Sequence, residues 1–477
     1  MFKLPTHIPV TFKSSQGKFV DLLSPNDGKL LCKVQETTQE DIDFLLQETP
    51  KIQQDIKKMY PYERAAILKK AASNISENSD FHAWLIASEG GKPLKDAIIE
   101  VSRAVSTLEL CAEETLRLEG EVVPMERTPA GKDHLAFTLR EPIGPVLAIS
   151  AFNHPLNLIA HQVGAALASG CSVVLKPAPA TPLSAYFMED AFRKAGLPEK
   201  FLRVVNAEIP LVEQLVSSSH FDFVSFIGSA SVGWELRKKI APGTRLALEH
   251  GGQAPAIIRE DADLSLATSA LVKGAFYHAG QVCISTQAIF VHESLKEQFL
   301  ARLTALATKL KVGPATEEDT DVGPLIRPAE VVRLQKAIKE ATDRGAKVIL
   351  GNEVSGNAGQ YLSPTILTDV PVDTSIMKDE AFGPVVCVNS YQDEEELLDY
   401  LNAKDYIFEA SLFTQDISRA MRIARELSTM TLVINNHTAF RVDQMPFGGH
   451  KKSGLGMGGI KYAMEEMTRT KQVIVRF

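Results

Sequence analysis

Apolar and polar positions follow two different spacings along the middle of the chain, and the change from one to the other predicts the secondary structure. After Gly144, short apolar segments that fit strands are each followed by a stretch with apolar residues at helical spacing. Strands that alternate with helices indicate a parallel sheet covered by helices, so we expect an α/β fold. The predicted strand and helix pairs are 145–149 with 156–169, 172–175 with 183–195, 201–205 with 211–217, and 223–227 with 233–240.

The same spacings return after Gly252 and predict a second α/β block. Ahead of both blocks, residues 38–115 are predicted to be mostly helical. A polar, β-prone stretch at 121–140 resembles a projecting hairpin, and residues 471–477 alternate like an edge strand that could pair with another subunit. In the second block the predicted strands are 256–258, 288–291, 347–350, 385–388 and 431–434, and the predicted helices are 264–278 and 295–310.

Length and composition narrow the class of protein. A chain of 477 residues is expected to form two or three domains. Its formal charge of −8 argues against a nucleic-acid partner, which normally needs a basic face. Five scattered cysteines favour a reducing compartment. The N-terminus lacks the apolar core of a signal peptide, and no apolar run reaches the roughly 20 residues of a membrane span. We therefore expect a cytoplasmic protein without a membrane partner.

Cys283 is the candidate nucleophile. It lies where a predicted apolar helix gives way to polar Gly280 and Gln281, just before a strand. Cysteine is often only a small buried apolar residue, and this is the favoured interpretation of the other four. A reactive cysteine works as a thiolate, so a base or an electropositive pocket must lie nearby.

Glu249 and Asn153 could complete such a site. Glu249 follows an apolar strand end and precedes Gly251 and Gly252, so a carboxylate there could have a raised pKa and act as a general base. The alternative is a solvated or ion-paired surface glutamate. Asn153 could donate a hydrogen bond to an oxyanion, although a turn or helix-capping role is a serious alternative.

Asn153, Lys176 and Gly228 each follow directly after a predicted strand. Ligands of parallel sheets bind beyond the carboxyl ends of the strands, so these positions suggest a ligand site. Gly228 and Gly233 bracket a predicted helix N-terminus, which together with Ser229 could receive a pyrophosphate. Lys176 could hold ribose hydroxyls or a phosphate, or could simply be solvated. The glycine-rich segment 454–459 lies too near the C-terminus for a following βαβ unit and is interpreted as a loop. No histidine and cysteine spacing supports a metal site.

Taken together, these residues resemble the aldehyde dehydrogenase superfamily along nearly the whole chain, and within it the lactaldehyde, phosphonoacetaldehyde and semialdehyde dehydrogenase branches. Each segment is modest alone, but their combination in this order is highly specific. The matching segments are Phe152-Asn153-His154-Pro155, Lys176-Pro177-Ala178-Pro179, Gly228-Ser229, Glu249-His250-Gly251-Gly252, Gly280-Gln281-Val282-Cys283, Glu380-Ala381-Phe382-Gly383-Pro384 and Pro446-Phe447-Gly448-Gly449.

The resemblance implies three domains: a Rossmann-type parallel-sheet cofactor domain, an α/β catalytic domain and a small β oligomerisation domain, assembled as a homodimer or homotetramer. The expected boundaries are 1–119 and 140–248 for the cofactor domain, 249–445 for the catalytic domain, 120–139 and 464–477 for the oligomerisation arm, and 446–463 for a return to the cofactor domain.

The resemblance also implies roles. Cys283 would attack an aldehyde, the Asn153 amide would stabilise the oxyanion, and Glu249 would activate water to hydrolyse the thioester. The cofactor would be NAD or NADP, because Pro179 stands where many NAD-preferring members carry glutamate. The other cofactor residues implied are Lys176 and Glu380 at the riboses, Ser229 with Gly228 and Gly233 at the pyrophosphate, and Phe382 near the nicotinamide ribose.

Four residues are the candidates for substrate recognition: Arg103, His154, Arg441 and Phe447. His154 replaces a frequent aromatic residue, and the two arginines would suit an anionic substituent on a short aldehyde. Structural ion pairs are an equally good account of the arginines. As alternatives to acid formation, the chain could transfer the acyl group to CoA, act as a thiol esterase, or keep the fold without catalysis. Retention of Glu249 disfavours CoA transfer, and the intact catalytic residues weigh against a non-catalytic protein.

Overall fold

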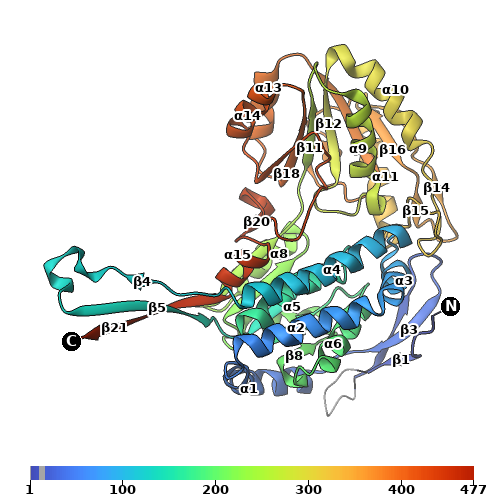
Figure 1. Cartoon of the computed structure of the whole chain (residues 1–477). Helices are drawn as coiled ribbons and strands as arrows, with labels where there is room; N and C mark the ends of the chain where they lie inside the picture. Colours follow the sequence, from blue (N-terminus) through green and yellow to red (C-terminus); the bar gives the residue numbers. More distant parts are fainter. Residues whose placement is uncertain (1, 10–16) are drawn as a thin grey trace.

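The computed structural model describes residues 2–9 and 17–477, so residues 1 and 10–16 of the expected cofactor domain lie outside the described part. Two separate sheets and a long arm form its framework (Figure 1). The first sheet has the strand order β20-β10-β9-β6-β7-β8, in which only β20 runs antiparallel to its neighbour. Its strands are β6 (Val146–Ile149), β7 (Val173–Lys176), β8 (Leu202–Val204), β9 (Phe223–Ile227), β10 (Arg245–Glu249) and β20 (Gly454–Leu455).

Both faces of this sheet are buried, which explains why its strands are apolar runs and not alternating patterns. In β6, Val146 and Ala148 join one apolar core, whereas Leu147 and Ile149 join another on the opposite face. The first core is formed with α2 (Pro61–Ser76), α3 (Ser79–Gly90), α4 (Leu94–Thr115), α5 (Asn157–Ser169) and α6 (Leu183–Lys194), and the second with α1 (Gln39–Ile56), α7 (Ile209–Ser217) and α8 (Ala230–Lys239).

The chain order makes β6 and β9 the pair at which the strand order reverses, because β7 and β8 follow on one side and β9 and β10 on the other. Ligands of open α/β sheets bind beyond the carboxyl ends of the strands at such a point. The loops after β6 and β9 begin at Ser150 and Gly228. A small sheet of β1 (His7–Ile8), β2 (Phe19–Leu23) and β3 (Leu30–Gln35) lies beside this lobe.

The second sheet belongs to the upper lobe in Figure 1 and has the order β13-β16-β17-β12-β11-β18-β19. All its pairings are parallel except that of β13 with β16. Its strands are β11 (Ala254–Ile258), β12 (Thr286–His292), β13 (Lys347–Leu350), β16 (Thr365–Thr368), β17 (Val385–Tyr391), β18 (Glu409–Phe413) and β19 (Thr431–Ile434). The helices of this lobe are α9 (Leu264–Phe276), α10 (Lys296–Ala307), α11 (Pro328–Asp343), α12 (Ser375–Lys378), α13 (Glu394–Asn402) and α14 (Ile417–Glu426), and β14 (Val354–Ser355) pairs with β15 (Tyr361–Leu362).

Two expectations for local structure were wrong. Helix α9 ends at Phe276 and not at residue 278, because His278, Ala279 and Gly280 all adopt positive φ angles of 48°, 52° and 68°. Two of these are non-glycine residues in the left-handed region, which no composition signal announces. The segment 454–459 is also not entirely a loop, since its first two residues form β20 and pair with the end of β10.

The arm combines β4 (Val122–Val123), β5 (His134–Pro142) and β21 (Thr468–Arg476), with β21 preceded by α15 (Ile460–Glu466). Strands β5 and β21 pair antiparallel along their whole lengths, from Pro142 with Thr468 to His134 with Arg476. The arm extends away from both lobes (Figure 1). Leu135, Leu139 and Ile474 are exposed on it. The expected domain boundaries and the role of the arm in assembly stay predictions. Among the described residues, no helix has the length and apolar character that a bilayer crossing requires.

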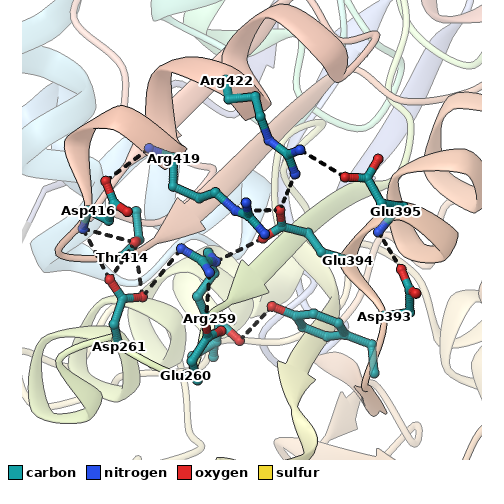
Figure 2. A network of polar contacts seen from close by, with 12 residues as sticks. Arg259, Glu260, Asp261, Asp393, Glu394, Glu395, Thr414, Asp416, Arg419 and Arg422 are labelled. Atoms are coloured by element: carbon teal, nitrogen blue, oxygen red, sulfur yellow. Dashed lines mark hydrogen bonds and ion pairs between the residues drawn. The ribbon is translucent and has the colours of Figure 1, made fainter.

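One ion network ties the upper lobe together at the end of its sheet. Arg259, which follows β11, and Arg419 and Arg422 of α14 all converge on the carboxylate of Glu394 at the start of α13 (Figure 2). The nitrogen to oxygen distances are 2.7–2.8 Å, and the Glu394 side chain is only 9% exposed. This one buried carboxylate is therefore the shared partner of three guanidinium groups, two of which also pair with other carboxylates.

Replacing Glu394 by alanine should lower the free energy of unfolding by about 2 kcal/mol, the range for loss of hydrogen bonds between charged groups. Among the described residues, the buried Arg259 then keeps only its contacts with Glu260 and Asp261. The matched control is Glu395→Ala, next in sequence, whose side chain is 66% exposed and pairs only with Arg422. That change should cost less than about 1 kcal/mol. Urea unfolding of both variants measures the difference, and equal shifts would show that the network contributes no more than a surface ion pair.

Candidate active site

The three candidate catalytic residues, which are far apart in the sequence, line a single cavity. The cavity has a volume of about 1590 Å3, and its walls come from both sheets. Cys283 reaches it from the upper lobe, whereas Glu249 and Asn153 reach it from the ends of β10 and β6. In the strand order β10 and β6 lie on either side of β9, so the topology of this sheet brings Glu249 and Asn153 near each other, and the upper lobe adds Cys283 to the same cavity.

Cys283 follows the left-handed turn at residues 277–280 and is the only partly exposed cysteine among the five, all of which are described. Its neighbours Val282 and Ile284 pack with Phe408 and Phe447, which fixes the loop. Burial raises the pKa of the Cys283 thiol well above its usual value, and the charges of the nearby carboxylates raise it further. The resting group is therefore a thiol, and its attack on a carbonyl requires a base to remove the proton.

Glu249 is a second titratable group that lines the same cavity. It is the last residue of β10, where its backbone carbonyl accepts a hydrogen bond of 3.1 Å from the Gly228 N–H. Burial raises the pKa of its carboxyl group to about 7, and the positive charge of Arg441 partly opposes this. A carboxyl group with a pKa near neutrality can exchange a proton with a thiol or a water molecule.

Asn153 lies in the loop between β6 and α5 and is buried. Its side-chain Nδ2 donates a hydrogen bond of 3.0 Å to the backbone carbonyl of Gln281, two residues before the nucleophile. The amide carries a second hydrogen that can reach an oxyanion. The helix-capping alternative does not hold, because the N-cap position of α5 is Leu156. One amide thus links the loop after β6 to the cysteine loop.

The same cavity offers groups that fit a dinucleotide. Lys176 makes no ion pair within the described part of the chain, and burial lowers its pKa to about 8. The Oε1 atom of Glu380 is buried without a hydrogen-bond partner, and burial raises the pKa of this carboxyl to about 8. Ser229 begins α8, whose N-terminal N–H groups suit a phosphate. Gly228, Pro179 and Phe382 line the same region.

Gly233 is placed differently from the other candidates. It is not among the cavity-lining residues, and a Cβ atom there would lie 2.0 Å from the His250 ring. Its small size lets α8 pack against His250, which in turn contacts the Gly228 carbonyl through Nδ1 at 3.0 Å. Gly251 has a similar packing function, because a Cβ atom there would lie 1.7 Å from the Glu380 carboxylate.

The substrate candidates surround the cysteine. Arg441 stacks over the Phe447 ring, with the guanidinium carbon 3.5 Å from the ring centre. Its Nη1 atom is buried without a hydrogen-bond partner, and Arg441 forms no ion pair with any residue that the structure describes. Arg103 differs, because its charge is already matched by Asp443 through contacts of 2.8 and 3.2 Å. Of the two, only Arg441 has a buried nitrogen atom without a hydrogen-bond partner.

His154 contributes a neutral polar group. Burial, followed by the positive charges of Lys92 and Arg103, holds the pKa of its imidazole well below the usual range. Its Nε2 lies 3.4 Å from the Tyr277 hydroxyl. Tyr277 lines the cavity, as do Met457 and Gly458, yet sequence reasoning did not single them out. A tyrosine directly after an apolar helix gives no signal of its own, whereas the glycines around Met457 do mark a close backbone approach.

No group of three histidine, cysteine, aspartate or glutamate side chains in 2–9 and 17–477 is arranged to hold a metal ion.

Comparison with known proteins places these features in context. The chain matches the Aldehyde dehydrogenase family over residues 12–473. One relative, 3-sulfolactaldehyde dehydrogenase of Priestia aryabhattai, is 41% identical over 416 residues, which cover 87% of this chain and 86% of the relative.

Two solved structures are similar along their whole lengths. Aldehyde dehydrogenase 21 from Physcomitrella patens, in complex with the reaction product succinate, is 32% identical, with a TM-score of 0.95 and 99% of both chains covered. Glyceraldehyde-3-phosphate dehydrogenase from Methanocaldococcus jannaschii, complexed with NADP, is 36% identical, with a TM-score of 0.92 and coverage of 97% of this chain and 100% of the other. This likeness confirms the predicted α/β fold class.

Proposed function

The chain belongs to the aldehyde dehydrogenase family, and on this premise we propose that it oxidises a short, polar or anionic aldehyde to its carboxylic acid with NAD or NADP. The observation that carries the proposal is the meeting of Cys283, Glu249 and Asn153 in one cavity that also reaches Lys176 and Glu380. A thiol, a carboxyl group with a pKa of about 7 and a buried amide donor supply the three functions that the reaction needs.

The chemistry of the chain divides into two halves. The Cys283 sulfur, on losing its proton, bonds to the aldehyde carbon to give a thiohemiacetal, while the Asn153 amide and the Cys283 N–H hold the oxyanion. NAD or NADP, when bound, would supply the oxidant as the acceptor of a hydride from that carbon. Glu249 then takes a proton from water, whose oxygen attacks the resulting thioester, and Cys283 leaves as the thiolate.

The nucleotide would lie along the carboxyl ends of β6, β7 and β9. In this arrangement Lys176 and Glu380 bind the two riboses, the N-terminus of α8 with Ser229 binds the pyrophosphate, and Phe382 packs near the nicotinamide ribose. Pro179 offers no carboxylate against a 2′-phosphate, and the similar glyceraldehyde-3-phosphate dehydrogenase is complexed with NADP. Turnover of an aldehyde panel with each nucleotide tests this, and activity without either nucleotide would contradict the proposal.

Arg441 is the residue that favours an anionic substrate. It is the guanidinium with a free buried donor at the cysteine end of the cavity. A sulfonate or carboxylate on the aldehyde would use that donor in a charge-assisted hydrogen bond. The relative named 3-sulfolactaldehyde dehydrogenase and the structure with succinate point to the same class of substrate. His154 and Tyr277 would face a hydroxyl group of the same substrate.

Replacing Arg441 by glutamine should lower kcat/KM for short anionic aldehydes by about 10- to 100-fold, the value of a hydrogen bond to a charged group. Neutral aldehydes of equal length should lose less than about threefold. The assays should be run at a pH of about 9. Arg441 also lowers the pKa of Glu249, so at neutral pH the loss of Arg441 would reduce the fraction of Glu249 that is ionised.

The Arg103→Gln variant serves as the comparison, since the Arg103 charge is already paired with Asp443. We expect Arg103→Gln to lower kcat/KM for anionic aldehydes, relative to neutral ones, by less than Arg441→Gln does. An equal loss on anionic and neutral substrates in the Arg441 variant would remove the proposed anion recognition while leaving aldehyde oxidation itself in place.

We also propose that the arm joins subunits into a homodimer or homotetramer. The support is the exposed apolar surface of Leu135, Leu139 and Ile474 on a strand pair that leaves the lobes. Light scattering of the purified protein measures the subunit number.

A further inference from the structure

One face of helix α4 contacts all three loops that surround the cysteine. Asp96, Glu100, Arg103 and Thr107 are spaced by four, three and four residues, so their side chains lie along one side of the helix. None of the four is needed for the chemistry proposed above. Three of them are buried, although such residues are usually solvated on a helix surface.

Glu100 holds the loop that carries Asn153. Its Oε1 accepts hydrogen bonds from the backbone N–H groups of Leu156 at 2.9 Å and Asn157 at 3.1 Å. Its other oxygen forms an ion pair with Lys92, and neither side chain has any exposed surface. Because the two N–H groups lie three and four residues after Asn153, the Glu100 carboxylate fixes the end of that loop.

The same pair is close to the cysteine loop. The Lys92 ammonium lies 6.0 Å from the centre of the Tyr277 ring, in the turn before Cys283. Burial raises the pKa of the Asp96 carboxyl group to about 6. A hydrogen bond from the backbone N–H of His278, one of the positive-φ residues of that turn, partly opposes this rise. Residues held at positive φ persist only where their surroundings fix them.

The third loop is attached further along the helix. Arg103 binds Asp443, two residues after Arg441, and Asp443 also accepts a hydrogen bond of 3.2 Å from the Asn157 side chain. Thr107 in turn donates to the Asn157 Oδ1 at 3.1 Å. Asn157 is thus bound by its backbone to Glu100 and by its side chain to the Arg441 loop.

We propose that Glu100, locked by Lys92, is a positioning residue that sets the Asn153 amide at the distance from Cys283 that oxyanion stabilisation requires. It contacts neither substrate nor cofactor and acts only through the backbone after Asn153. Oxyanion donors lose much of their effect when displaced by a few tenths of an ångström, so a fixed support matters for rate. The inference depends on the proposed roles of Asn153 and Cys283.

The test is a double-mutant cycle between Glu100→Gln and Asn153→Ala, read as the rate of the first turnover at saturating nucleotide. Glu100→Gln alone should slow that rate by about 10- to 100-fold, less than the roughly 100- to 1000-fold loss seen when an oxyanion donor is removed, because the donor is displaced and not deleted. In the Asn153→Ala background the same change should cost less than about threefold, because the group it positions is already absent. Nucleotide Kd should be unchanged.

Glu89 provides a matched control. It is also a fully buried glutamate that receives two helix N-terminal N–H groups, from Leu183 at 2.8 Å and Ser184 at 2.9 Å. That helix, α6, carries no group of the acylation step. Glu89→Gln should lower the Tm about as much as Glu100→Gln yet leave the first-turnover rate within about threefold.

Three results would overturn the inference: equal slowing by Glu89→Gln, independent and multiplying effects of Glu100→Gln and Asn153→Ala, or a normal rate in Glu100→Gln. Should Glu100→Gln fail to fold because Lys92 is left as an unpaired buried charge, the neutral pair Lys92→Met with Glu100→Gln replaces it in the same cycle with the same expectations. If the unaltered protein forms no acyl group on Cys283, the proposed function fails; if it does and the cycle is additive, only this inference fails.

Discussion

The Cys283→Ser variant is expected to oxidise aldehydes at least about 10^3-fold more slowly than the unaltered protein while binding NAD or NADP with the same affinity. The reason is that serine lacks the acidity and nucleophilicity of a thiol. Lys176 and Glu380, which we propose to bind the nucleotide, come from parts of the chain other than the cysteine loop. Nucleotide binding should therefore persist in the variant. Absorbance of the reduced nucleotide gives the rate, and calorimetric titration gives the affinity.

A second cysteine serves as the control for loss of a thiol in general. Cys387 lies in β17 within the apolar core of the same lobe, where burial raises its pKa to about 12. Cys387→Ala should retain kcat/KM within about threefold. Near-normal turnover in Cys283→Ser would refute the assignment of the nucleophile.

Replacing Glu249 by glutamine should separate the two halves of the reaction. The first turnover should proceed to a burst of reduced nucleotide close to one per site, because Glu249 is assigned to the water step and not to the attack by Cys283. The steady state should then fall by about 10^2- to 10^4-fold, since no base activates water against the thioester. A proportional loss in burst and steady state would show that Glu249 acts before the acyl group forms.

The pH dependence follows from the same carboxyl group. Its pKa is raised to about 7 by burial, and only the deprotonated form can accept a proton. In the unaltered protein the steady-state rate should therefore rise with pH up to about 7 and level off above it. The Glu249→Gln variant should lack this step, and an unchanged pH profile in the variant would assign it to another group.

The strand and helix alternation between residues 145 and 240 was predictable because the strands there are short, mostly buried apolar runs and the helices between them carry apolar residues at helical spacing. The turn at residues 277–280, just before Cys283, was not predictable. His278 and Ala279 adopt left-handed angles because the surrounding contacts, including Asp96, hold them there, and such contacts leave no local pattern. Lys92 and Glu100 read as ordinary charged residues of a helical region, although both are fully buried.

The candidate site shows the same division. Residue types and strand ends indicated Cys283, Glu249 and Asn153, but only the strand order shows that one cavity receives all three. Glycine spacing suggested Gly233 as a phosphate contact, whereas the structure places it against His250. The spacing of glycines in a sequence indicates where a small residue is needed. It does not show whether a ligand or another side chain, here that of His250, occupies the space.

The central claim is that Cys283 carries the substrate as a thioester which Glu249 helps to hydrolyse. It is tested most directly by mixing the Glu249→Gln variant with an anionic aldehyde and nucleotide, quenching in acid and locating the acyl group by peptide mass spectrometry. The account predicts the added mass of the acyl group on the peptide that contains Cys283, at nearly one per subunit. An acyl group on another residue, or none while reduced nucleotide accumulates, would contradict it.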